Sequence, residues 1–146
     1  MGLTLSTNTT IVTVTYNSMA VLPSMLNSIP GGTPIIIVDN GSKDIMALKK
    51  ISKKVGAKLI INRINKGFGE ACNQGASIAK TEFIFFLNPD ATIEMETLIN
   101  LENSAAINPN VFAMNPKILK PTGRQYFKRS SHLLDRSDWM SRVAPK

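Results

Sequence analysis

Short apolar runs rich in β-branched residues alternate with stretches that carry helical signals along most of the chain. Apolar runs without polar alternation are typical of strands that are buried on both faces of a sheet. The predicted strands are 11–15, 34–38, 58–61 and 83–87, and the predicted helices are 18–29, 43–55, 68–80 and 94–107. This alternation predicts an α/β fold, with a mostly parallel sheet flanked by helices in a three-layer sandwich.

The pattern weakens after the fourth predicted helix. Short strands are predicted at 111–114 and 117–119, and a short helix is predicted at 133–143. We therefore divide the chain into an α/β domain at 1–116 and a C-terminal extension of the same domain at 117–146.

Composition and length fit one globular domain. The 146 residues are 43% hydrophobic and 18% charged, which is enough apolar material for a substantial core. The sequence has one cysteine, no visible secretory leader and no apolar run near the roughly 18 residues that cross a bilayer. We therefore expect a cytoplasmic protein without an intramolecular disulfide.

The formal net charge of +7 is concentrated at the C-terminal end. Residues 117–146 contain eight Lys and Arg residues and two acidic residues, so this segment carries +6 and the rest of the chain carries +1. A nearly neutral body does not indicate a nucleic-acid-binding protein, whereas a basic segment favours a local anionic partner. Peripheral contact with the inner face of the cytoplasmic membrane and a solvated tail both fit this segment.

Polar residues follow the carboxyl end of each of the four predicted strands. Open α/β sheets bind ligands at this edge. Each segment alone is ordinary turn chemistry, but four segments on one edge favour a binding site. The segments are Thr15-Tyr16-Asn17, Asp39-Asn40-Gly41-Ser42, Asn62-Arg63-Ile64-Asn65-Lys66-Gly67 and Asn88-Pro89-Asp90.

The residue types at this edge suit a nucleotide. The ring of Tyr16 can lie against a base, and the carboxylate of Asp39 can accept a hydrogen bond from a pyrimidine imide. Arg63 or Lys66 can meet phosphate oxygens. Asp90 can hold a divalent metal that bridges a diphosphate, or it can form an Asx turn or a helix cap, and the residues alone leave both roles open.

Gly67-Phe68-Gly69 does not complete a dinucleotide-binding fingerprint. That glycine-rich loop follows the first strand tightly and has a third glycine. Here the glycines come after the third predicted strand, and Cys72 occupies the position of the third glycine. A nicotinamide or flavin enzyme is therefore disfavoured.

Four sequence blocks stand in a characteristic order and spacing. They include Ile-Val-Thr-Val-Thr-Tyr-Asn at 11–17, Val-Asp-Asn-Gly-Ser at 38–42, the asparagine- and glycine-rich segment 62–75, and Phe-Leu-Asn-Pro-Asp-Ala at 86–91. Together these blocks resemble the family 2 glycosyltransferases, and the Asn-Pro-Asp form is most similar to the rhamnosyltransferase-like branch, which acts on cell-surface polysaccharide. The resemblance implies a GT-A fold and inverting transfer from a UDP- or dTDP-linked sugar to a saccharide or lipid-linked acceptor.

The resemblance also implies roles for individual residues. Thr15, Tyr16 and Asp39 match positions that hold the base and ribose of the donor, and Arg63 and Gly67 lie in a loop near base and phosphate. Asp90 matches a ligand of Mg²⁺ or Mn²⁺ in an Asp-x-Asp motif whose first acid is replaced by Asn88. With their neighbours at the strand ends, the expected donor-binding residues are Thr15, Tyr16, Asn17, Asp39, Asn40, Gly41, Arg63, Asn65, Gly67 and Asn88, and the expected metal ligand is Asp90.

One part of the family pattern is not found in this sequence. Family members continue with an acceptor-binding region that supplies the general base, whereas the acids after residue 116 are Asp135 and Asp138 in a basic context. We therefore expect the donor-binding portion of a transferase, an incomplete catalytic unit without an assigned general base. The alternative is a non-catalytic nucleotide-sugar-binding or interaction module.

Overall fold

The structure is a computed structural model that describes residues 8–120, 122 and 134–135. The chain forms two compact units, Met1–Glu96 and Thr97–Lys146. The first unit contains the whole of the main sheet. The predicted division of the chain after residue 116 stays a prediction.

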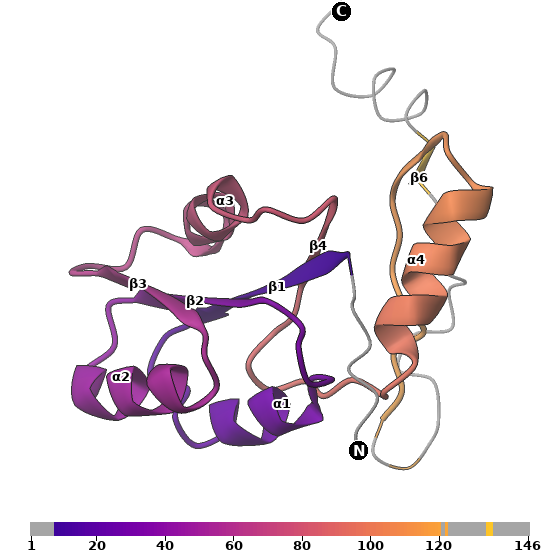
Figure 1. Cartoon of the computed structure of the whole chain (residues 1–146). Coiled ribbons are helices and arrows are strands. Elements are labelled where there is room, and N and C mark those ends of the chain that lie inside the picture. The colour runs from indigo at the N-terminus through magenta and orange to yellow at the C-terminus, as the bar shows by residue number, and fades with distance from the viewer. Residues whose placement is uncertain (1–7, 121, 123–133, 136–146) are drawn as a thin grey trace, which may run out of the picture. The chain divides into compact units, whose positions relative to one another are not determined.

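The first unit is a three-layer α/β sandwich (Figure 1). Its elements are β1 (Thr9–Thr15), α1 (Leu22–Ser28), β2 (Ile35–Asn40), α2 (Ile45–Lys54), β3 (Lys58–Asn62), α3 (Phe68–Ser77) and β4 (Phe83–Phe86). The four strands are parallel in the order β3-β2-β1-β4. Helices α1 and α2 lie on one face of the sheet and α3 lies on the other (Figure 1). The predicted α/β architecture is confirmed.

Strand β1 occupies the centre of the sheet, between β2 and β4. Its register pairs Thr15 with Asp39 of β2 and Val12 with Phe86 of β4. The chain passes from β1 to β2 on one side and reaches β4 on the other, so the strand order reverses beside β1. In open α/β sheets the crevice at such a reversal is the usual place for a ligand.

The face of the sheet under α3 is packed closely enough to require a glycine. Val12, Val38 and Ala71 belong to one buried apolar cluster. Gly75 of α3 lies against the same cluster, and a Cβ added at Gly75 would collide with Cγ1 of Val12 and come within 3.2 Å of Cγ2 of Val38. Gly75 therefore lets the helix backbone approach the sheet.

Thr13, near the middle of β1, is fully buried, and its Oγ1 has no hydrogen-bond partner in the described part of the chain. An unpaired buried hydroxyl costs about 1–3 kcal/mol, and valine has nearly the same shape. We expect Thr13→Val to raise the free energy of unfolding by about 1 kcal/mol, measured by urea unfolding. The control is Thr10→Val, which should destabilise, since the Thr10 hydroxyl is bonded to Oγ1 of Thr81 at 2.6 Å. A destabilised Thr13→Val protein would contradict this account.

Cys72 lies on α3 with 8% of its surface exposed, and burial raises the pKa of its thiol from the ordinary value of 9.0. Because the thiolate is the reactive form, we expect iodoacetamide to modify Cys72 much more slowly in the native protein than in denaturant. The neutral thiol is favoured in the folded state, so its contribution to stability is complete at neutral pH and is lost as the pH rises through the raised pKa. Mass spectrometry checks the alkylation rate, and urea unfolding across alkaline pH checks the stability. Equal alkylation rates in the native and the denatured protein would contradict the first expectation.

Three of the four predicted helices begin later than the sequence predicts, whereas α3 begins at Phe68 as predicted. Helix α1 begins at Leu22 rather than at 18, with Pro23 in its first turn as expected, because the polar residues before it bond locally in a loop. Helix α2 is capped by Asp44, whose carboxylate accepts a hydrogen bond from the backbone N–H of Ala47 at 3.0 Å. Side chains that bond nearby backbone groups compete with the first turn of a helix.

The second unit contains α4 (Thr97–Ile107), β5 (Val111–Ala113) and β6 (Leu134–Asp135). Strands β5 and β6 pair antiparallel with an irregular register. The predicted helix over 133–143 is wrong at Leu134–Asp135, because pairing with β5 overrides a weak helical pattern. The predicted strand at 117–119 is reduced to a single bridge residue, Leu119. Most of the predicted basic extension, at 121, 123–133 and 136–146, lies outside the described residues.

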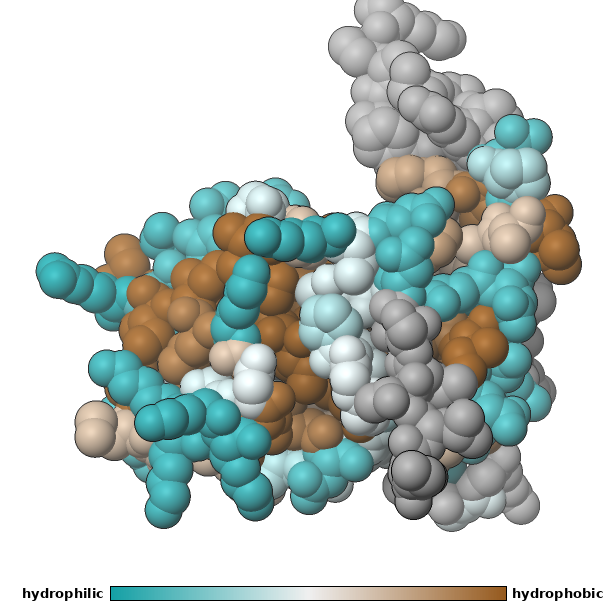
Figure 2. Space-filling model, in the orientation of Figure 1, coloured by the Kyte–Doolittle hydropathy of each residue, from teal (hydrophilic) through white to brown (hydrophobic). Residues whose placement is uncertain are grey.

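Strand β3 forms one edge of the described four-stranded sheet. Figure 2 shows apolar surface over this side of the first unit, crossed by hydrophilic side chains. Ile61 on β3 and Ile64 just after it are 40% and 70% exposed. Lys58 begins this strand and Arg63 follows it, and such charges on an edge strand oppose pairing with other chains.

Candidate functional site

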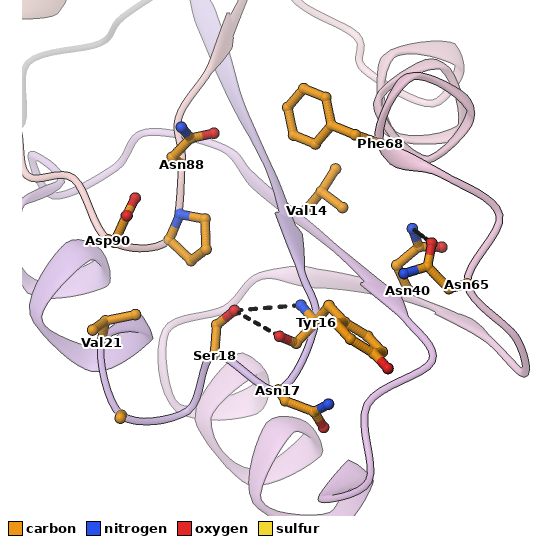
Figure 3. A pocket seen from close by; sticks show the side chains of 12 residues that line it. Val14, Tyr16, Asn17, Ser18, Val21, Asn40, Asn65, Phe68, Asn88 and Asp90 are labelled. Atoms are coloured by element: carbon orange, nitrogen blue, oxygen red, sulfur yellow. Dashed lines mark hydrogen bonds between the residues drawn. The ribbon is translucent and has the colours of Figure 1, made fainter.

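An open pocket of about 560 Å³ lies at the carboxyl ends of β1, β2 and β4, where the strand order reverses. Its walls come from the end of β1 and the loop after it, the end of β2, the segment that begins α3 and the loop after β4 (Figure 3). The lining residues are Val14, Tyr16, Asn17, Ser18, Ala20, Val21, Asn40, Asn65, Phe68, Asn88, Pro89 and Asp90.

The structure brings together part of the predicted set. The predicted residues that line the pocket are Tyr16, Asn17, Asn40, Asn65, Asn88 and Asp90. The predicted residues outside the lining are Thr15, Asp39, Gly41, Arg63 and Gly67. Thr15 and Asp39 are buried, and Arg63 is exposed on the loop after β3. The binding roles of all eleven residues stay predictions.

The carboxylate of Asp39 is engaged in the turn after β2. Asp39 is fully buried, its Oδ2 accepts from the N–H groups of Gly41 at 3.3 Å and Ser42 at 3.1 Å, and its Oδ1 accepts from Ser42 at 3.3 Å. This is the local bonding of an Asx turn. Asp39 therefore shapes the rim of the pocket, and its contact with a pyrimidine imide stays a prediction.

Asn17 ties the loop after β1 to the loop after β2. Its backbone has a φ of 53°, in the left-handed region that asparagine tolerates. Its N–H donates to Oγ of Ser42 at 2.8 Å, and its Oδ1 accepts from the N–H of Lys43 at 3.0 Å. These bonds hold the backbone beside Tyr16, whose ring is 54% exposed at the pocket.

Gly41 allows the loop after β2 to touch the loop after β3. Its φ is 94°, and an added Cβ would stand 3.1 Å from the backbone nitrogen of Asn65 and 3.2 Å from the carbonyl carbon of Ile64. A side chain at Gly41 would therefore be strained and would push these loops apart. The sequence prediction placed Gly41 at the site, and the structure gives it this backbone role.

Amide side chains beside the pocket form a connected cluster. The Nδ2 of Asn62 donates to Oε1 of Gln74 at 2.8 Å and to Oδ1 of Asn40 at 3.3 Å. The Nδ2 of Asn40 donates to Oδ1 of Asn65 at 2.9 Å (Figure 3). The cluster joins β2, β3, the loop after β3 and α3.

The charge of the pocket is unusual for a site that would take a phosphate. Among the described residues that line it, Asp90 is the only ionised side chain at neutral pH, and no lysine or arginine is present. In Figure 3, Asn88 and Asp90 lie on one side of the pocket, while Phe68, Asn40 and Asn65 lie on the other. Tyr16, at 54%, and Phe68, at 59%, present exposed rings.

A metal ion at Asp90 would have few protein ligands. Within the described residues, no group of three or more His, Cys, Asp or Glu side chains is placed to hold an ion. Mg²⁺ typically uses one or two carboxylates and completes its shell with waters and substrate phosphates. Asp90, in a pocket whose described lining has no lysine or arginine, fits this mode of Mg²⁺ binding.

Sequence reasoning missed several lining residues. Phe68 was predicted only as the start of a helix, yet its ring lines the pocket directly after Gly67, which has a φ of 87° and caps α3. An aromatic residue after a glycine at a helix start is the signal that was available. Pro89 belongs to the predicted strand-end segment 88–90 but was not singled out as a binding residue, and nothing in the local pattern marked Val14, Ser18, Ala20 or Val21.

Comparison with known proteins identifies the class. The sequence model of Glycosyl transferase family 2 matches residues 10–143. The chain belongs to this glycosyltransferase family. An uncharacterized glycosyltransferase from Haemophilus influenzae is 30% identical over an alignment of 105 residues, which covers 69% of this chain and 35% of that protein. The chain thus spans about a third of the length of the curated relative it matches.

Solved structures of S. aureus TarS share the fold. The crystal structure of TarS 1–349 has a TM-score of 0.60 at 21% identity, covering 80% of this chain and 43% of that chain. The complex of the same TarS fragment with UDP-GlcNAc has a TM-score of 0.56 at 27% identity, covering 70% of this chain and 31% of that chain. The predicted GT-A-like α/β fold is therefore confirmed, and membership in a glycosyltransferase family is shown.

Proposed function

We propose that this chain binds the nucleotide-sugar donor of an inverting glycosyltransferase in the pocket at the ends of β1, β2 and β4. The observation that carries the proposal is the placement of this pocket at the reversal of strand order in a family 2 chain. A similar protein, TarS, has been crystallised with UDP-GlcNAc. The exposed rings of Tyr16 and Phe68 offer apolar faces for a base or a sugar.

We propose that the donor is a pyrimidine nucleotide-sugar, linked to UDP or dTDP. The pocket offers polar groups whose hydrogen-bonding capacity is not filled within the described part of the protein. The Oδ1 of Asn65 is occupied by bonds from Asn40 and Gly67, which leaves its Nδ2 to donate to a ligand. The amide of Asn88 and the carboxylate of Asp90 stand on the other side.

We propose that the diphosphate binds together with Mg²⁺ or Mn²⁺ through Asp90. A diphosphate brings negative charge into a pocket whose one ionised lining side chain is also negative. Without a cation, the two would repel each other. A divalent ion supplies charge stabilisation for the leaving diphosphate when it is bound. Asn88, at the position of the first acid of the motif, offers an amide oxygen in place of a second carboxylate.

Transfer to an acceptor needs more than donor binding. An acceptor hydroxyl must lose its proton as it attacks the sugar, and a positioned carboxylate contributes about 10²- to 10⁴-fold to such a step. Asp90 is the one carboxylate among the described lining residues, and the proposal assigns it to the metal. We therefore propose that these residues bind the donor and that the general base lies elsewhere.

The acceptor class is a further part of the proposal. A saccharide or lipid-linked acceptor fits the resemblance of the Asn-Pro-Asp segment at 88–90 to the rhamnosyltransferase-like branch. None of the described helices has the length and apolarity to cross a bilayer. The eight Lys and Arg residues of 117–146 support peripheral contact with anionic lipid. Co-sedimentation with anionic but not neutral vesicles is the expected result, and equal behaviour with both would contradict the contact.

Calorimetry tests the donor proposal. We expect the full chain to bind UDP or dTDP in the presence of Mg²⁺, and to bind ADP and GDP at least about tenfold more weakly, because a purine presents a different hydrogen-bonding edge from the pyrimidine of the proposed donor. Equal binding of all four diphosphates would remove the pyrimidine from the proposal. Absence of binding to any of them, with or without Mg²⁺ and Mn²⁺, would overturn the donor site and favour an interaction module.

A further inference from the structure

Asn40 uses the whole hydrogen-bonding capacity of its side chain, with three bonds to the loop after β3 and one to the end of β3. It is the last residue of β2, and 3% of its surface is exposed. Its Nδ2 donates to Oδ1 of Asn65 at 2.9 Å and to the carbonyl of Gly67 at 3.1 Å. Its Oδ1 accepts from the N–H of Lys66 at 3.0 Å and from Nδ2 of Asn62 at 3.3 Å. An amide has two donors and two acceptor lone pairs, and all four are occupied.

The loop held by Asn40 builds one wall of the pocket. Asn65 and Phe68 line the pocket on this side (Figure 3). Gly67 caps α3 with no side-chain cap of its own, and its N–H donates to Oδ1 of Asn65 at 2.8 Å. The place where α3 begins, and hence the place of the Phe68 ring, therefore depends on the bonds from Asn40 and Asn65.

We propose that Asn40 is a positioning residue that preforms this wall of the donor pocket. The inference rests on the proposed donor binding, and it assigns Asn40 a contact with the loop rather than with the donor. An exposed loop that is not held in place must be ordered when a ligand binds, and that ordering weakens affinity. Asn40 removes this cost because its amide fixes the loop before the donor arrives.

The chemistry of the amide gives the proposal a distinctive test. In Asn40→Asp, the introduced carboxylate has no donor for Oδ1 of Asn65 or for the carbonyl of Gly67, and it places negative charge against both oxygens. Protonation of that carboxylate returns one donor. The variant should therefore regain affinity as the pH falls toward about 5, since burial against oxygen atoms disfavours the charged form.

Asn73→Asp is the matched control. Asn73 is exposed on α3 and does not line the pocket, so this variant makes the same chemical change away from the loop. Both variants keep the other ionisable side chains of the surrounding elements, so a difference between them isolates position 40. Those side chains are Tyr16 after β1, Asp39 on β2, Arg63 and Lys66 in the loop, and Glu70 in the first turn of α3.

The experiment measures the Kd of UDP with Mg²⁺ for the full chain and both variants across pH. We expect Asn40→Asp to bind at least about tenfold more weakly than Asn73→Asp near neutral pH, and this ratio to shrink as the pH falls. A purely structural role would lower the unfolding midpoint without a pH-dependent ratio. Equal Kd values for the two variants at every pH would overturn the proposal.

Hydrogen exchange of the unchanged protein keeps the proposal testable if Asn40→Asp does not fold. The N–H of Lys66 should be protected from exchange before any nucleotide is added, because Oδ1 of Asn40 holds it. Fast exchange of this amide that slows only with UDP would show that the ligand orders the loop, and would overturn the proposal. If the unchanged protein binds no nucleotide, the donor proposal fails, while protection of Lys66 still decides whether Asn40 holds the loop.

Discussion

Asp90→Asn is expected to abolish the increase in UDP affinity that Mg²⁺ or Mn²⁺ produces in the unchanged protein. Asp90 is the one ionised side chain among the described pocket-lining residues, so the proposed metal loses the only charged ligand that this lining offers. Two unit charges about 4 Å apart interact by about 1 kcal/mol in water and about 4 kcal/mol near a protein surface. We therefore expect affinity with metal to fall by roughly 10- to 100-fold, measured by calorimetry.

Without metal, the change in UDP affinity that Asp90→Asn causes should reverse its sign. With chelator present, Asp90→Asn should bind UDP as well as the unchanged protein or more tightly, because a carboxylate that repels the diphosphate is gone. Glu94→Gln is the control, since Glu94 is an exposed acid in the same segment that does not line the pocket. A metal-dependent increase that survives in Asp90→Asn would remove Asp90 from the metal role.

Gly75→Ala is expected to destabilise the fold by about 1–3 kcal/mol, even though alanine is the better helix former. The added methyl would collide with Cγ1 of Val12, which lies on the central strand with 1% of its surface exposed. Valine is β-branched and stiff, so it cannot turn away without leaving its preferred rotamer. The unfolding midpoint in urea should fall, and Val12→Ala added to Gly75→Ala should cost less than the sum of the two single changes.

Gly69→Ala is the matched control for this prediction. Gly69 lies in the same helix, but an added Cβ would meet no atom within 4 Å. At Gly69 only the higher helix propensity of alanine should act, so the free energy of unfolding should rise by up to about 1 kcal/mol. Two glycine-to-alanine changes in one helix should thus shift stability in opposite directions. A loss of stability at both sites would place the cause in helix α3 rather than in the contact with Val12.

The sheet is predicted well from the sequence because each of its strands contains a short apolar run. Short β-branched runs such as 11–15 favour strands over helices by their length and residue type, and the parallel order follows from the helices between them. The carboxyl-end segments of β1, β2 and β4 were predicted as a site edge, and the pocket lies there. Elements that depend on tertiary pairing were harder to predict, as β6 shows at Leu134–Asp135.

The sequence does not predict which polar residues at the site bond within the protein and which ones line the pocket. Asp39 and Asn40 are adjacent polar residues that look equally suited to a ligand. Yet the Asp39 side chain bonds to backbone in its own turn, and the Asn40 side chain bonds to backbone and amide side chains of the neighbouring strand and loop. That choice depends on where the loop after β3 meets the loop after β2, which local pattern does not encode. Phe68 was predicted only as the first residue of a helix, and the exposure of 59% of its surface at the pocket depends on the path of the loop before it.

The bonds around Asn40 are also expected to slow deamidation at the Asn40-Gly41 step. Asparagine followed by glycine deamidates readily, because the glycine nitrogen can attack the side-chain carbonyl carbon with little hindrance. In the fold, the N–H of Gly41 donates to Oδ2 of Asp39, and the amide of Asn40 is anchored by its own bonds. Unfolding frees both groups. Prolonged unfolding is therefore expected to speed conversion of Asn40 to aspartate or isoaspartate, and this covalent change would persist after refolding.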